Sequence, residues 1–196
     1  MQAYCQNVFS SLPVLETPRL RLRPLTMRDD RDMYRYCSDP EVSRHVLWET
    51  HESLRHSRQV LRAALRQYRS GAPSSFAIER RSDRRMIGTI GFMWINCDHR
   101  SGEVGYSLAR DCWNQGYCTE ALGAVLRFGF EELKLHRIEA QHEVDNPASG
   151  RVMEKCGMRC EGTLRGRVFN KGRFSDVKLY AILRTDPLPR AADFHA

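Results

Sequence analysis

The chain has 196 residues and a mass of 22.8 kDa, and its 41% hydrophobic and 28% charged residues are typical of one globular domain. It contains no apolar run long enough to span a membrane, and residues 1–13 lack the basic start and apolar stretch of a signal peptide. A net charge of +7 would suit nucleic acid, but the basic residues are spread along the whole chain, so nucleic acid is not expected as the primary partner.

The first part of the chain predicts one strand and two helices. Apolar and basic residues alternate over residues 19–25, as in a half-buried strand. Helical spacing follows over residues 27–37 and 52–69, and the Gly-Ala-Pro sequence at 71–73 ends the second helix. The arginines of that helix recur at every third or fourth position, which predicts a solvated face: Arg55, Arg58, Arg62, Arg66 and Arg69.

The middle of the chain predicts three strands and a long helix. Two strands at residues 75–80 and 85–96 are joined by a turn at 81–84, and a third strand begins at Glu103. Apolar residues at three-and-four spacing over residues 117–133 predict a helix with one face in the core.

The last part predicts a strand, a short helix and a pair of strands. After a strand at residues 136–144, a helix begins at Pro147 behind Asn146 as N-cap and ends at Gly157. Two strands follow, joined by an Asn-Lys-Gly turn, at residues 158–169 and 173–183.

The resulting order, βααβββαβαββ, predicts an α+β (mixed α/β) fold. No internal repeat or low-complexity tract divides the chain, so a single domain over residues 1–196 is expected. Residues 1–14 and 186–196 are expected to be flexible tails.

The segment GEVGYSLARDCWNQGYCTEAL, residues 102–122, carries the clearest functional pattern. It places Glu103 on a short strand and then opens a helix directly after the amide-rich loop at 114–119. The first backbone N–H groups of such a helix lack intrahelical partners and bind anions, phosphates above all. A nucleotide P-loop needs a Lys followed by Ser or Thr at the helix start, but here Thr119 is followed by Glu120 and no Lys is near. A dinucleotide fingerprint needs three spaced glycines, and the loop at 114–119 has only Gly116.

Four segments in the right order resemble the GNAT acetyltransferases, and within them the RimJ/RimL branch that acetylates N-termini of ribosomal proteins. The first part of the chain supplies LETPRLRLR (15–23) and DPEV (39–42). The third segment combines GEVGYSL (102–108) with WNQGYCTEA (113–121), and the fourth is NPASGRVMEKCGM (146–158). The resemblance extends over about residues 15–185.

This resemblance implies a twisted mixed sheet of about seven strands flanked by about four helices, with two neighbouring strands splayed apart beside the pantetheine arm. It implies acetyl-CoA as co-substrate and no metal. The backbone of three strand residues would pair with pantetheine, and the loop would hold the pyrophosphate. The implied cofactor-binding residues are Tyr106, Ser107, Leu108, Asn114, Gln115, Gly116, Tyr117, Cys118, Thr119, Asn146 and Ser149.

Glu103 and Ser149 are the catalytic candidates. Glu103 would accept a proton from the amine, directly or through water; the alternative is a surface glutamate on a strand. Ser149 would hydrogen-bond the CoA sulfur and protonate it; the alternative is a capping serine in the first helical turn. Many family members carry a tyrosine acid later on that helix, where this chain has Met153, which favours Ser149 or water.

Two loop residues depart from the family pattern. Gln115 stands where many members have Arg or Lys, so one cation at the pyrophosphate is lost. Cys118 replaces a small Ala or Gly at the helix start, where its thiol pKa could be lowered. A ping-pong nucleophile at Cys118 is not expected, because the family transfers acetyl directly to the bound amine. Trp113 and Tyr117 are expected to serve packing.

The predicted function is direct acetyl transfer from acetyl-CoA to a primary amine, either a protein N-terminus, such as that of a ribosomal protein, or a small amine. The alternatives are a non-catalytic CoA-binding module, a polyamine or antibiotic acetyltransferase, and an RNA-binding protein suggested by charge alone. A homodimer is left open. Seven scattered cysteines without a CxxC pair predict free thiols in a reducing cytoplasm, without disulfides or a metal.

Overall fold

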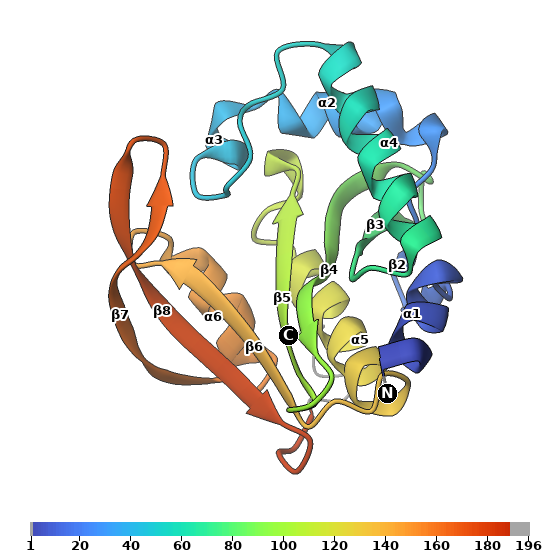
Figure 1. The fold of residues 1–196 in the computed structure, drawn as a ribbon. Coiled ribbons are helices and arrows are strands. Elements are labelled where there is room, and N and C mark those ends of the chain that lie inside the picture. Colours follow the sequence, from blue (N-terminus) through green and yellow to red (C-terminus); the bar gives the residue numbers. More distant parts are fainter. Residues whose placement is uncertain (1, 189–196) are drawn as a thin grey trace.

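The computed structural model describes residues 2–188 of the chain, which form one β-sheet and the α-helices that pack around it (Figure 1). The helices are α1 (Gln2–Ser10), α2 (Asp30–Cys37), α3 (Pro40–Ser43), α4 (Leu54–Ser70), α5 (Tyr117–Glu131) and α6 (Pro147–Lys155). Short 3₁₀ turns lie at Met27–Asp29 and Arg110–Cys112. The strands are β1 (Leu15–Glu16), β2 (Leu20–Pro24), β3 (Ser75–Arg80), β4 (Met86–Asn96), β5 (Ser101–Leu108), β6 (Arg137–Glu143), β7 (Arg159–Asn170) and β8 (Arg173–Leu183).

The eight strands form one sheet in the order β1-β2-β3-β4-β5-β6-β8-β7. All neighbours are antiparallel except β5 and β6, which are parallel and are connected by helix α5. Figure 1 shows α5 and α6 behind β4, β5 and β6, with α4 crossing in front of β3. This is the predicted mixed α/β fold, and residues 2–188 contain eight strands and six α-helices in place of the expected seven and four.

Local sequence signals explain where the helices begin and end. The Ser53 side chain accepts the His56 N–H at the start of α4, and Gly71 ends that helix with φ of 66°, a left-handed conformation. The Asn146 side chain accepts the Ser149 N–H at 3.4 Å at the start of α6. The predicted N-cap of α6 is therefore confirmed.

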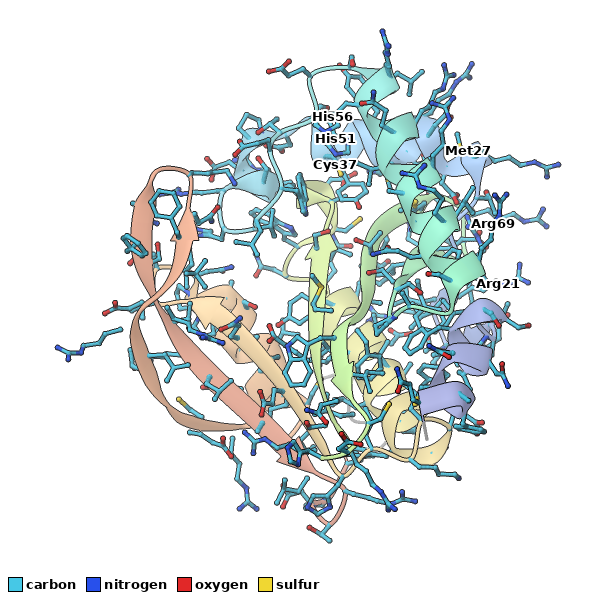
Figure 2. All side chains as sticks on the ribbon, in the orientation of Figure 1. Arg21, Met27, Cys37, His51, His56 and Arg69 are labelled. Carbon is cyan, nitrogen blue, oxygen red and sulfur yellow. The ribbon has the colours of Figure 1, made fainter. Side chains whose placement is uncertain are left out.

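Helix α4 has the solvated arginine face that its spacing predicts. All five arginines of that face are exposed, and Figure 2 shows Arg69 on the outer side of the molecule. The opposite face is buried through Leu61 and Tyr68. The Tyr68 hydroxyl donates to the Ser75 carbonyl at 2.5 Å and accepts the Leu25 N–H at 3.0 Å, which fixes α4 against strands β2 and β3.

The expectation of a flexible tail over residues 1–14 is wrong for residues 2–10, which form α1. Phe9 is fully buried, and its ring contacts Phe92 of β4 edge-on at a centroid distance of 6.3 Å. Cys5 and Phe9, four positions apart on one face, are the buried residues of this helix, and at nine residues it is too short to be stable without those core contacts. Asp186 accepts the Leu183 N–H at 3.0 Å, and residues 189–196 of the second predicted tail lie outside the described residues.

Candidate active site

The candidate site lies where strands β5 and β6 separate. They pair only from Ser101 to Glu103, opposite residues 137–139. Beyond Glu103, β5 stays paired with β4 as far as Leu108, while β6 pairs with β8 as far as Glu143. Within residues 2–188, no strand joins the edge of β5 that this separation exposes. Backbone N–H and C=O groups on that edge can bind an extended ligand as a further strand would, which is the splayed arrangement that the resemblance implies.

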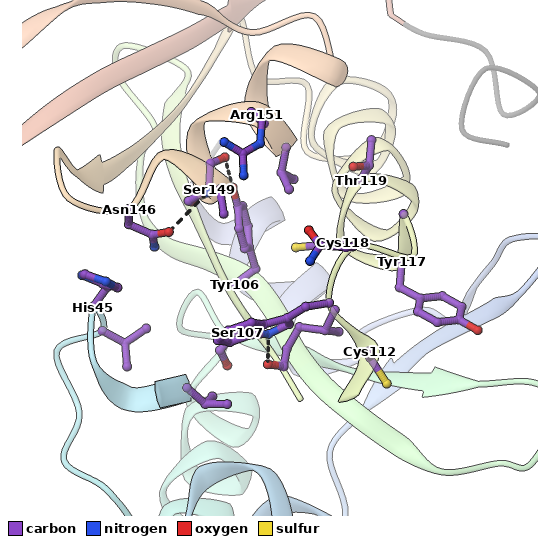
Figure 3. A pocket seen from close by; sticks show the side chains of 18 of the residues that line it. His45, Tyr106, Ser107, Cys112, Tyr117, Cys118, Thr119, Asn146, Ser149 and Arg151 are labelled. Carbon is purple, nitrogen blue, oxygen red and sulfur yellow. Dashed lines mark hydrogen bonds between the residues drawn. The ribbon is translucent and has the colours of Figure 1, made fainter. Parts of the chain in front are cut away.

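A cavity of about 440 Å³ adjoins this opening, between the end of β5 and the starts of α5 and α6 (Figure 3). The residue before α5, Gly116, has no side chain to cap the helix, and the Glu120 N–H bonds back to its carbonyl at 3.0 Å. The preceding N–H groups, of Tyr117, Cys118 and Thr119, are those that a helix start leaves without intrahelical acceptors. All three residues line the cavity, so its floor suits an anion such as a phosphate.

Ten of the eleven predicted cofactor-binding residues line this cavity: Tyr106, Ser107, Leu108, Asn114, Gly116, Tyr117, Cys118, Thr119, Asn146 and Ser149. The Leu108 carbonyl already accepts the Trp113 indole N–H at 2.8 Å, which holds Trp113 at the strand end, where it also lines the cavity. Figure 3 shows the Tyr117 ring pointing away from Tyr106 and Ser149. Its ring lies 4.6 Å from the Arg19 guanidinium, so a packing role for the Tyr117 side chain is supported.

Gln115, the eleventh predicted cofactor-binding residue, does not line this cavity. Its side-chain amide donates to the Asp111 carbonyl at 2.8 Å and so turns back onto its own loop. Arg151 and Lys155 of α6 line the cavity instead, and sequence reasoning missed them. Their spacing of four residues places them on one face of a helix, but only the docking of α6 beside α5 turns that face towards the phosphate loop.

The buried Glu120 fixes the loop from behind. Its carboxylate accepts the Thr17 hydroxyl at 2.6 Å, the Arg19 N–H at 2.9 Å and the Arg19 Nε at 2.7 Å. Burial alone would raise the pKa of Glu120, but these hydrogen bonds and the guanidinium charge outweigh it and hold the pKa below its usual value. Arg19 also donates to the Gln115 carbonyl at 2.9 Å, so the turn before β2 supports the helix start.

Ser149 lies against the Tyr106 side chain in the opening. The Tyr106 hydroxyl is 2.9 Å from Ser149 Oγ and 3.0 Å from the Ser149 carbonyl oxygen (Figure 3). Burial raises the pKa of Tyr106 well above its usual value, so the phenol stays protonated and can donate. The family resemblance implied a role for the Tyr106 backbone alone, and the contact of its side chain with Ser149 forms only because β5 and α6 meet.

Glu103 lines a second cavity, of about 300 Å³, on the other side of the same opening. Its carboxylate accepts the Trp94 indole N–H at 2.8 Å and the Gln141 amide N–H at 3.0 Å. Both donors are neutral, so they orient the carboxylate and leave its charge uncompensated. The two cavities share six lining residues: His45, Val46, Tyr106, Ser107, Asn146 and Ser149.

Cys118 is a thiol and not a thiolate. Burial, with a smaller contribution from nearby Cys156, raises its pKa well above the usual range, which overrides the lowering that its place at a helix start suggested. Cys156 itself donates to the Thr119 carbonyl at 3.3 Å. Cys118 therefore lines the cavity as a protonated thiol, while Cys156 is buried beneath the helix start.

The loop after α3 is joined to the β7–β8 hairpin across the second cavity. The Lys171 ammonium at the hairpin tip donates to the carbonyls of Ser43, Val46 and Trp48 at 2.9, 2.8 and 3.2 Å. His45 Nδ1 of the same loop lies 2.9 Å from Glu143 Oε2 of β6. Sequence patterns gave no signal for this bridge, which joins residues about 125 positions apart.

Residues 2–188 contain neither a candidate metal-binding cluster nor a membrane-spanning helix. They contain no group of three or more His, Cys, Asp or Glu side chains that could hold a metal ion. Their helices are too short or too polar to cross a membrane.

Comparison with known proteins gives consistent similarities. Residues 19–159 match the family described as "Acetyltransferase (GNAT) domain". The chain is 34% identical to the uncharacterized N-acetyltransferase YoaA of Bacillus subtilis over 88% of this chain and 97% of that protein. It is 29% identical to the ribosomal-protein-serine acetyltransferase of Escherichia coli, over 64% of this chain and 69% of that one. The crystal structure of a Vibrio cholerae spermidine N-acetyltransferase with CoA and spermine superposes with a TM-score of 0.73 at 27% identity, covering 85% of this chain and 96% of that one.

Proposed function

This chain belongs to the GNAT acetyltransferase family, and from that premise we propose that it transfers the acetyl group of acetyl-CoA directly to the α-amino group of a protein N-terminus. The observation that carries the proposal is the meeting of two cavities at Tyr106 and Ser149. One cavity ends on the uncapped start of α5, which suits the pyrophosphate of CoA. The other ends on Glu103, which suits an amine.

The residues present fit the co-substrate. Arg151 and Lys155 line the cavity beside the uncapped helix start, and together these groups offset the cation lost at Gln115. The free edge of β5 would pair with pantetheine, which would place the thioester near Ser149. Asn146, which caps α6 through the Ser149 N–H, holds this part of the wall in place.

In the proposed reaction the amine nitrogen attacks the thioester carbonyl, and the carbon–sulfur bond breaks as the carbon–nitrogen bond forms. Glu103 accepts the proton that the nitrogen loses, directly or through a water. Ser149 donates a proton to the departing sulfur and regains one from solvent. An α-amino group titrates near ~8, against ~10.4 for a lysine, so it needs the smaller help from a base.

The test is an acceptor screen with purified protein and acetyl-CoA. Peptides with the N-termini of ribosomal proteins, polyamines and aminoglycosides are offered in turn, and free thiol release is followed. We expect release with N-terminal peptides and its loss in Glu103→Gln. Binding of CoA without thiol release for any acceptor would instead identify a non-catalytic CoA-binding module.

A further inference from the structure

The second cavity, which Glu103 lines and which would receive the acceptor amine, is also lined by Glu143. The Glu143 carboxylate is already paired with other side chains. Its Oε2 lies 2.9 Å from His45 Nδ1 and 3.3 Å from the Arg173 guanidinium. Its Oε1 accepts the Asn170 amide N–H at 3.0 Å. Glu143 is only 5% exposed, so little of it remains for a ligand. Burial would raise the pKa of Glu143, but these neighbours outweigh it and hold the pKa below its usual value.

Glu103 is in the opposite situation. Its two hydrogen-bond donors, Trp94 and Gln141, are neutral, and no cation of the described chain forms an ion pair with it. The side chain is half-buried, where a charge interacts more strongly than on an open surface. Glu103 is thus the carboxylate of this cavity that an incoming ammonium can neutralise.

The position of Glu143 determines whether the cavity can bind an amine that carries a second positive charge. Glu143 follows Gln141 by two residues on the same face of β6, about 7 Å along the strand. A second ammonium that reached this end of the cavity would find the Glu143 carboxylate already paired with the Arg173 guanidinium, and the two cations would repel each other. Much of the remaining wall is apolar: Val46, Leu47, Trp48, Met93, Val168 and Val177.

We infer that the acceptor is an amine with a single positive charge, followed by an uncharged and partly apolar group. The inference rests on the proposed function and narrows it, because it favours a polypeptide N-terminus that begins with uncharged residues over a polyamine. Glu103 takes the charge of the amine, while His45, Asn170 and Arg173 keep Glu143 from taking a second one.

Calorimetry on the CoA-loaded protein tests the charge preference without catalysis. The probes are a C-terminally blocked peptide beginning Ser-Ala, the same peptide with Lys second, and spermidine. We expect the singly charged peptide to bind at least about tenfold more tightly than either polycation. Equal or tighter binding of spermidine would overturn the inference. Thiol release in the same samples tests the proposed function separately, because the charge preference can hold without turnover and turnover can occur without the preference.

A variant locates the preference at Glu143. Arg173→Met removes the neighbouring cation, so spermidine affinity should rise about two- to fivefold relative to the singly charged peptide, as for the loss of a partly exposed ion pair. The matched control is Arg165→Met, an exposed arginine of the same hairpin that, unlike Arg173, does not pair with Glu143. An unchanged ratio in a folded Arg173→Met protein contradicts the assignment.

Discussion

The Tyr106 hydroxyl lies 2.9 Å from Ser149 Oγ and 3.0 Å from the Ser149 carbonyl oxygen. A phenol has one proton, so it can donate to only one of these two oxygens at a time. When it donates to Oγ, the Ser149 proton is free to point into the cavity. When it donates to the carbonyl, Ser149 donates back to Tyr106. In the proposed reaction, this choice of hydrogen bond would decide whether the Ser149 proton is available to the leaving thiolate.

Ser149→Ala should lower kcat by about 10- to 100-fold, because one positioned proton donor contributes about that much. Tyr106→Phe should lower kcat less, since Ser149 keeps its proton and loses only its partner. Cys118→Ala should leave kcat near wild type, because the protonated thiol has only a packing role. Steady-state kinetics measure all three variants. A stable acetyl adduct on Cys118 by mass spectrometry, with an inactive Cys118→Ala, would instead establish a ping-pong mechanism.

Glu103→Gln should lower kcat roughly 10²-fold at neutral pH while CoA affinity stays unchanged, because the base is removed and the shape is kept. The new amide oxygen can still accept the Trp94 N–H, and Gln141 can turn its own oxygen to the new NH₂ group. Glu139→Gln is the control: that carboxylate pairs with Arg137 at 2.6 Å and lines neither cavity. Full activity of Glu103→Gln across the pH range would make Glu103 structural.

Gly116→Val should weaken CoA binding by about tenfold or more. Gly116 has φ of 78°, which valine rarely adopts, and it lines the cavity at the start of α5. Gly166→Val is a matched control, since Gly166 also has a positive φ of 58° but lies in open space on β7. Calorimetry on both folded variants separates backbone strain from loss of the anion site; equal CoA affinity in the two would remove Gly116 from it.

Glu120→Gln should lower the free energy of unfolding by about 2 kcal/mol at neutral pH, because the partly buried Arg19 loses its charged partner. The pKa of Glu120 is held below its usual value, so its contribution is complete above that value and is lost as the pH falls through the folded-state pKa. Urea unfolding should therefore show a difference from wild type that shrinks in acid. The exposed Glu131→Gln should show no such difference, and a pH-independent loss would assign the effect to packing.

Lys171→Met should loosen the loop after α3, because three backbone carbonyls lose their shared donor. Hydrogen exchange should become faster over residues 43–48, with CoA affinity unchanged. Lys171→Arg, which keeps a cation with several N–H donors, should exchange more slowly than Lys171→Met. Equal exchange in all three proteins would show that the bridge does not restrain the loop.

The sequence by itself determined the parts of the site that local structure builds. Strand alternation placed Glu103 on β5, and the Asn146 cap with Pro147 placed Ser149 in the first turn of α6. The helix start at Gly116 could be read because uncapped N–H groups follow from chain geometry alone. The order of the predicted elements agreed with a mixed α/β fold, and the resemblance to the GNAT family implied it.

Tertiary structure alone decided what depends on segments that meet from distant parts of the chain. Helix α1 forms because Phe9 reaches Phe92, and burial in the assembled wall reverses the expected pKa shift of Cys118. The Gln115 side chain turns back onto its own loop through a hydrogen bond to the Asp111 carbonyl, and the docking of α6 brings Arg151 to the cavity. Sequence periodicity predicts neither feature. Burial and contacts between distant segments of the chain determine these features, whereas sequence periodicity shows only which face of one element is apolar.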